Sequence, residues 1–407
     1  NADVNFLSGS IDDTNADVNF LSGSIDAIDL QSVTDVGNTT TNNIEVANLS
    51  ATGNITTGNN IASSLRSLAI GGQNNTALSA DSIVLGGKNN LAGGERSFII
   101  GGFDNIATGL DGEIIGGSKS IANADRTTTV GGLRLSATNT GAIVLGGVDN
   151  CAAGIRSAVL GGYRNTASGA VAAVLGGRSN QANGGCSNVA GGYDNCSIGA
   201  RSNVAGGSRN TACGNYSNVA GGRMNTACGP DSNVAGGRGN TACGNYSNVA
   251  GGKSNTACAD YSNVAGGYYN VASGTDSNVA GGVSNRASGQ TSNVAGGDGN
   301  QACGEKSNVA GGSSNQAIGN NSNVAGGYLN TACGINSAIL GGTINIILSA
   351  HTDSFIIGSN ITSSAACTTF VNNLSAQGTI AAGNGFTGTV ASPTSITVVN
   401  GIVTAVS

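Results

Sequence analysis

The residues best suited to chemistry in this 407-residue chain are its ten cysteines. Four of them recur every fifteen residues, at Cys213, Cys228, Cys243 and Cys258. If successive fifteen-residue segments stack as neighbouring strands, the Cα atoms of these cysteines lie about 4.8 Å apart, within the range that a disulfide accepts. Inter-strand disulfides and free thiols that pack as small apolar groups both fit this spacing.

Other kinds of chemistry have little support. A metal needs ligands on several sides, whereas one row of thiols presents them on one side, and the single histidine, His351, lies outside that row. No combination of Ser, His and acid recurs along the chain. The net charge is −6 with only 9% charged residues, which predicts no basic patch for nucleic acid, and no segment is apolar for long enough to form a membrane helix. We therefore expect no catalysis, cofactor, metal, nucleic-acid partner or membrane insertion.

The spacing of the cysteines belongs to a repeat of fifteen residues, seen clearly as SNVAGGSRNTACGNY from Ser202. Gly-Gly pairs begin every fifteen residues from Gly71 to Gly341, which makes nineteen units. We number each unit from its first glycine, so that Gly206 is position 1 and Ala220 is position 15. A fixed short period of this kind indicates stacked structural repeats.

The conserved positions within the unit alternate, which indicates strands rather than helices. Ser at position 12 and Val or Ile at position 14 lie on one face, as do Asn at position 5, Ala at position 7 and Gly at position 9. Fifteen of the sixteen Lys and Arg residues fall at positions 3, 4 or 11. We predict an all-β parallel solenoid with two short strands per rung, turns at positions 2 to 4 and 10 to 11, and a length of about 90 Å for nineteen rungs.

Two further rows follow from the repeat. Asn stacked on Asn at position 5 predicts a structural ladder of side-chain amides along the axis, with Asn210, Asn225, Asn240 and Asn255 as representatives. Position 15 is apolar in every unit although it faces away from position 14, which predicts that a partner chain covers it. The bulky members of this inter-chain apolar stripe are Ile70, Leu85, Ile100, Leu145, Leu160, Leu175 and Leu340.

Read from position 12, the unit is S-x-V-x-G-G-x-x-N-x-A-x-G-x-x, which resembles the YadA-like head repeats of trimeric autotransporter adhesins, repeats also found in phage and virus tail-fibre-like proteins. The resemblance covers roughly residues 66–349 and departs from the pattern by one extra glycine per unit and by Asn at position 5. It implies a left-handed β-roll in which three chains wind about a common axis.

The segments outside the repeat differ from it. Residues 1–28 contain a duplicated NADVNFLSGSID with apolar residues in steps of three and four, which fits a coiled-coil stalk or a pair of strands. Residues 29–65 are predicted to form a neck of short strands, and residues 66–349 the β-roll. Residues 350–407 are predicted to hold a degenerate rung and a β-hairpin around Asn400-Gly401, which caps the roll or docks onto another molecule.

Together these features predict a structural, extracellular homotrimeric fibre with an adhesive or spacer role, on a cell or virion surface. The chain itself is the expected partner, and a cell-surface or host receptor is unidentified. An end-to-end polymerised filament and a virion or tail fibre are the alternatives. An ice-binding solenoid is disfavoured because it needs a flat Thr-x-Thr array, whereas most units with Thr at position 6 carry Cys at position 8. Exposed tyrosines either contact a partner or pack on the next rung, the candidates being Tyr193, Tyr268, Tyr269 and Tyr328.

Overall fold

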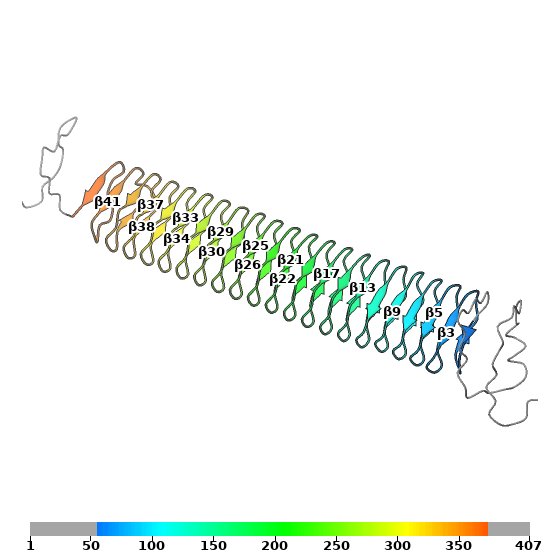
Figure 1. The fold of residues 1–407 in the computed structure, drawn as a ribbon. Helices are drawn as coiled ribbons and strands as arrows, with labels where there is room; N and C mark the ends of the chain where they lie inside the picture. Colours follow the sequence, from blue (N-terminus) through cyan, green and yellow to red (C-terminus); the bar gives the residue numbers. More distant parts are fainter. Residues whose placement is uncertain (1–54, 373–407) are drawn as a thin grey trace, which may run out of the picture. The chain divides into compact units, whose positions relative to one another are not determined.

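The structure is a computed structural model that describes residues 55–372. These residues form a straight rod of about 21 turns of parallel β-solenoid, with no helix in this range (Figure 1). Each complete turn of the chain, or rung, contributes two short strands and advances the rod by one strand spacing. The predicted all-β parallel solenoid is confirmed.

The strand boundaries follow the repeat. The even-numbered strands begin at position 6, are two residues long, and run at fifteen-residue intervals from β2 (Ile61–Ala62) to β40 (Ile346–Ile347). The odd-numbered strands begin at position 13, from β3 (Leu68–Ile70) to β39 (Ala338–Ile339). They are three residues long up to β11 and two residues long from β13 onward. The ends of the rod add β1 (Ile55–Thr56), β41 (Phe355–Ile357) and β42 (Thr369–Val371).

Every strand pairs in parallel with the equivalent strand of the rungs on either side. β23 (Asn218–Val219) pairs with β25 (Asn233–Val234), for example, with Asn218 opposite Asn233. This pairing joins β1, the odd-numbered strands and β42 into one sheet of 22 strands and the even-numbered strands into a second sheet. Because the register step is always one repeat unit through the nineteen units, each position of the repeat becomes a row of side chains parallel to the axis.

A third line of pairing runs along position 3, which the sequence placed in a turn. Single parallel bridges join this position in successive rungs, from Gln73 with Lys88 to Tyr328 with Thr343. Backbone hydrogen bonds along this row, such as Arg223 N to Gly237 O at 2.9 Å, form whatever the side chain is. The predicted turn at positions 2 to 4 was therefore wrong for position 3, because variable side chains concealed a regular backbone.

The core is thin and made of small residues. Val at position 14 and Ala at position 7 are fully buried in the typical rung, as Val219 and Ala212 show. Asn at position 5 and Ser at position 12 are buried beside them, and the Ser217 hydroxyl donates to the carbonyl of Gly214 at 2.7 Å. The apolar core divides into two clusters, one ending at Ala122 and the next beginning at Leu135.

Glycine at position 2 of every unit, and at position 9 of most units, is fixed by close stacking. A Cβ on Gly207 (φ 86°) or on Gly214 would overlap the carbonyl oxygen of the equivalent glycine in the next rung. The corners at positions 4 and 11 also have a left-handed backbone, but most residues there are not glycine, as with Arg209 (φ 55°) and Tyr216 (φ 58°). The side chains at these two corners point outward and vary in type, because the stacking leaves them free.

The remaining predictions about domains lie largely beyond this range. The coiled coil or strand pair of residues 1–28, most of the neck and the terminal hairpin fall outside the described residues. Residues 55–65 of the predicted neck carry β1 and β2, which stack on the following rung. Residues 353–361, read as a degenerate rung, carry β41.

Candidate interaction surfaces

The asparagines at position 5 form a buried ladder, but its bonds run to the backbone. Asn225 Nδ2 donates to the carbonyls of Gly221 (2.8 Å) and Gly237 (3.0 Å), while its Oδ1 accepts from the backbone N–H of Asn240 at 2.9 Å. The same pattern holds at Asn210, Asn240 and Asn255. Each of these amides ties its own rung to the next one, a structural role.

Direct pairing of side-chain amides occurs at position 5 only between Asn75 and Asn90 and between Asn300 and Asn315 within the described residues, but it is continuous at position 13, on the outer face. Ten consecutive asparagines, from Asn188 to Asn323, are joined by nine Nδ2 to Oδ1 hydrogen bonds of 2.7–2.9 Å. The sequence analysis did not single out this ladder, although the recurring S-N-V-A segment carries its signal.

Position 15 forms an exposed row on the same outer face. In the first eight units the row is aliphatic, and its members Ile70, Leu85, Ile100, Ile115, Leu145, Leu160 and Leu175 are 37–47% exposed, whereas Val130 is half-buried. From Ala190 to Ala325 the row is alanine, and Leu340 is again exposed. A continuous aliphatic row of this length, exposed at all members but Val130, is typical of a surface that contacts another protein.

The cysteine row lies at position 8, beside the even-numbered strands. All ten cysteines are free thiols, and Cys213 Sγ lies 2.7 Å from Cys228 Sγ. Burial, followed by the neighbouring Cys213 thiol, raises the pKa of Cys228 to about 12. Burial also raises the pKa of Cys243, with Cys258 as a smaller cause. Thiols of high pKa are poor nucleophiles, so Cys228 and Cys243 fit small packing groups better than reactive sites.

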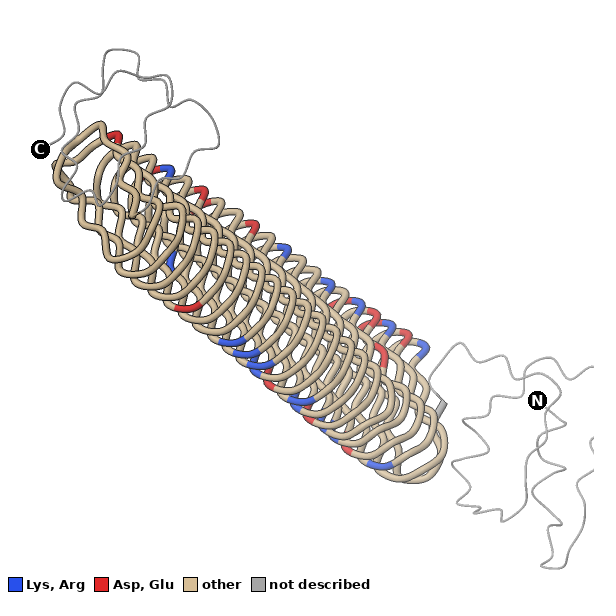
Figure 2. The backbone as a smooth tube through the Cα atoms, turned by 90° about the vertical axis from the view of Figure 1, so that its left-hand side faces the viewer, with Lys and Arg blue, Asp and Glu red and all other residues tan. Residues whose placement is uncertain are grey.

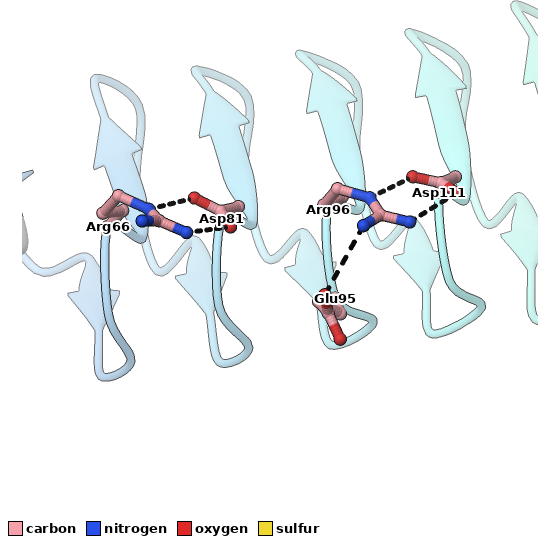
Figure 3. A network of polar contacts seen from close by, with 5 residues as sticks. All are labelled: Arg66, Asp81, Glu95, Arg96 and Asp111. Atoms are coloured by element: carbon pink, nitrogen blue, oxygen red, sulfur yellow. Dashed lines mark hydrogen bonds and ion pairs between the residues drawn. The ribbon is translucent and has the colours of Figure 1, made fainter.

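Charged residues gather along two edges of the rod, as Figure 2 shows. On the position 11 edge, basic and acidic residues alternate over the first rungs, from Arg66 to Asp111 (Figure 3). Arg66 donates two hydrogen bonds to Asp81, and Arg96 does the same to Asp111, at 2.5–3.0 Å. The hydrogen bonds from Arg66 hold the pKa of the Asp81 carboxyl below its usual value. The charges of these two pairs are therefore neutralised between adjacent rungs.

The tyrosines of the second edge, at positions 3 and 4, are partly covered by neighbouring rungs. Arg178 lies over the rings of both Tyr163 and Tyr193, with centroid distances of 5.5 and 5.7 Å. Lys253 lies 5.0 Å from the ring centroid of Tyr268, which contacts Tyr269 at a centroid distance of 4.1 Å. Tyr193, Tyr268, Tyr269 and Tyr328 nevertheless remain 36–52% exposed.

The second edge also carries a local excess of positive charge, although the net charge of the whole chain is −6. Over seven consecutive rungs, six carry an exposed cation at position 3 or 4: Arg164, Arg178, Arg209, Arg223, Arg238 and Lys253. We call these residues the basic edge. Only Asp194 opposes them within those rungs at these positions. The net charge of −6, from which we predicted no basic patch for nucleic acid, does not reveal this local row of cations.

No protein-family model matches the chain, and no curated protein matches it. Within residues 55–372 there is no cluster of three or more metal-ligating side chains. Over the same range, no helix has the length and apolar character needed to cross a membrane. The surfaces described above are therefore the basis for a functional interpretation.

Proposed function

We propose that the chain is a structural protein that assembles into an extracellular homotrimeric fibre with an adhesive or spacer role. The observation that carries this proposal is the exposed aliphatic row at position 15. A second copy of the rod presents the same row with the same rung spacing, so two copies can bury it rung by rung along its length. Because the core of a single rod is thin, burial of these apolar side chains between copies would be the main additional source of stability for the assembly.

Three chains are favoured over two by the resemblance of the repeat to head repeats of trimeric adhesins. A closed ring of three uses one contact repeatedly and leaves no open end at the side of the assembly. The charged and aromatic edges then remain on the outside, where they vary from rung to rung. That arrangement suits a stiff spacer whose corners meet other molecules.

The test is the native mass of the purified chain across a concentration series, measured by light scattering with and without reductant. We expect a constant mass of three chains. The variant Leu145→Asn with Leu160→Asn and Leu175→Asn should lower that mass, since it replaces aliphatic side chains of the row with a residue that the rod stacks elsewhere.

The matched control replaces three equally exposed aliphatic residues at the corners, Ile155, Leu329 and Ile335, with Asn. It should keep the native mass. A stable monomer for the unaltered chain, or a row variant that remains trimeric, would refute the proposed interface. A mass that climbs with concentration would support an end-to-end filament instead.

A further inference from the structure

The basic edge differs from the other charged rows of the rod. Several arginines elsewhere meet a carboxylate in an adjacent rung: Arg66 bonds Asp81, Arg96 bonds Asp111, and Arg134 bonds Asp149. Arg126, Arg156 and Arg201 have no such ion pair within residues 55–372, but no second cation occupies position 11 of the rungs next to them. In the basic edge, by contrast, Arg223, Arg238 and Lys253 follow one another in parallel register. No ion pair joins any of these three residues to an acid within residues 55–372.

The register places like charges at the closest spacing that a solenoid allows. Consecutive rungs are about 4.8 Å apart, and like charges directly opposite one another in a sheet are destabilising. The neighbouring position 4 in these rungs is occupied by Met224, Gly239 and Ser254, so that no acid lies beside the row. All three cations are exposed. An arrangement that costs the folded rod stability and faces solvent fits a binding surface for an external anion.

The geometry of the edge limits the class of anion. The charges follow a straight line parallel to the axis, at one per rung, so the complementary ligand is an extended chain with regularly spaced negative groups. Arginine recognises carboxylate and sulfate oxygens through paired N–H donors. Single-stranded nucleic acid is bound through free aromatic faces as well as charge, but Arg178 lies over Tyr163 and Tyr193 here, and Lys253 lies over Tyr268.

We propose that the row of Arg223, Arg238 and Lys253, extended by Arg178 and Arg209, binds an acidic polysaccharide laid along the rod through its carboxylate or sulfate groups. This specifies a ligand class for the adhesive role proposed above and rests on that role only for its setting, because the edge belongs to a single chain. Arg209 contributes less than the central three residues, since Asp194 lies 3.6 Å from it.

The experiment measures binding of heparin, polygalacturonate, neutral dextran and a single-stranded oligonucleotide to the full chain at several salt concentrations. Heparin and polygalacturonate should bind, and dextran should not. The variant Arg223→Gln with Arg238→Gln and Lys253→Gln should weaken binding of both acidic glycans at least about tenfold and reduce the slope of log affinity against log salt by about 2, as for the loss of three phosphate contacts.

The matched control removes three cations from the other edge, Arg126→Gln with Arg156→Gln and Arg201→Gln, and should change affinity less than about threefold if the effect is local rather than one of net charge. Equal losses in the two variants, or no binding of either acidic glycan by the unaltered chain, would overturn the proposal. Tighter binding of the oligonucleotide that is lost in the basic-edge variant would also overturn it, in favour of nucleic acid. Native mass measured on the same samples tests the trimer separately.

Discussion

The buried hydroxyl of Thr129 should be a weak point of the rod, and replacing it with Val should strengthen the rod. Thr129 occupies position 14, between Ile114 and Val144 in the adjacent rungs, and is fully buried. Its Oγ1 has no hydrogen-bond partner within the described residues. The apolar core is also divided in this part of the rod, between Ala122 and Leu135. Thr129→Val exchanges this hydroxyl for a methyl group of similar size.

The magnitude follows from two effects. An unsatisfied buried hydroxyl costs about 1–3 kcal/mol, and burial of one more methyl group contributes about 0.8 kcal/mol. We therefore expect the substitution to stabilise these rungs by about 2 kcal/mol. A local gain of that size slows hydrogen exchange about thirtyfold, and the amides of β11 (Thr128–Val130) and β13 (Ile143–Val144) should show it.

The assay is hydrogen exchange resolved to peptides, together with urea unfolding followed by circular dichroism. The control is Thr128→Val, the same exchange of atoms at position 13 on the outer face, which should change stability by less than about 0.5 kcal/mol. If Thr129→Val is no more stable than this control, the hydroxyl is satisfied or the core cannot accept the methyl group. Either result would refute the reasoning.

Three further predictions concern other rows. Asn225→Ala leaves the Gly221 carbonyl and the Asn240 N–H without a partner, while the Gly237 carbonyl keeps its bond from the Arg223 N–H. It should cost about 2 kcal/mol or more of unfolding free energy in urea, whereas Asn218→Ala on the outer face should cost less than about 1 kcal/mol; equal losses would contradict the backbone role of position 5. Val171 has φ 57°, a left-handed conformation that Asn tolerates better than Val. Val171→Asn should therefore raise the free energy of unfolding by about 1 kcal/mol. An unchanged melting temperature would count against backbone strain at Val171. The raised pKa of Cys228 leaves less thiolate near pH 8. Iodoacetamide should therefore label Cys228 more slowly in the folded, reduced chain than in urea, as measured by peptide mass spectrometry. Equal labelling rates would show that folding leaves the thiol unperturbed.

The parallel β-solenoid could be predicted from the sequence because each inward-facing position of the repeat carries nearly the same residue type in every unit. The alternation around Val219 and Ala212 located both strand rows, and the constant period implied parallel stacking. The bonding of position 5 could not be predicted in the same way. A stacked asparagine can pair with the next amide or with the backbone, and only the turn geometry, which directs the carbonyls of Gly221 and Gly237 toward Asn225, decides between the two.

The basic edge escaped prediction for a different reason. Net charge and charge content are averages over 407 residues, and they favour an acidic chain. One rung contains fifteen residues, so residues that are fifteen apart in the sequence occupy the same position of adjacent rungs. Arg223 and Arg238 therefore lie side by side although they are distant in sequence. The signal was present in the sequence at position 3, but it appears only when that position is followed from rung to rung.

The residues of the outer face change from aliphatic to small and polar between Leu175 and Asn188, and this change limits how copies of the rod can associate. Up to Leu175 the face carries the aliphatic row at position 15, and from Asn188 onward it carries the amide ladder at position 13 with alanine at position 15. Each inner amide of the ladder already spends one N–H and one oxygen lone pair on its neighbours, and alanine at position 15 offers a second chain little apolar area to bury. The proposed lateral contact should therefore draw most of its stability from the rungs before Leu175. The basic edge extends mainly over the rungs after it, where its ligand can bind without competing with that contact.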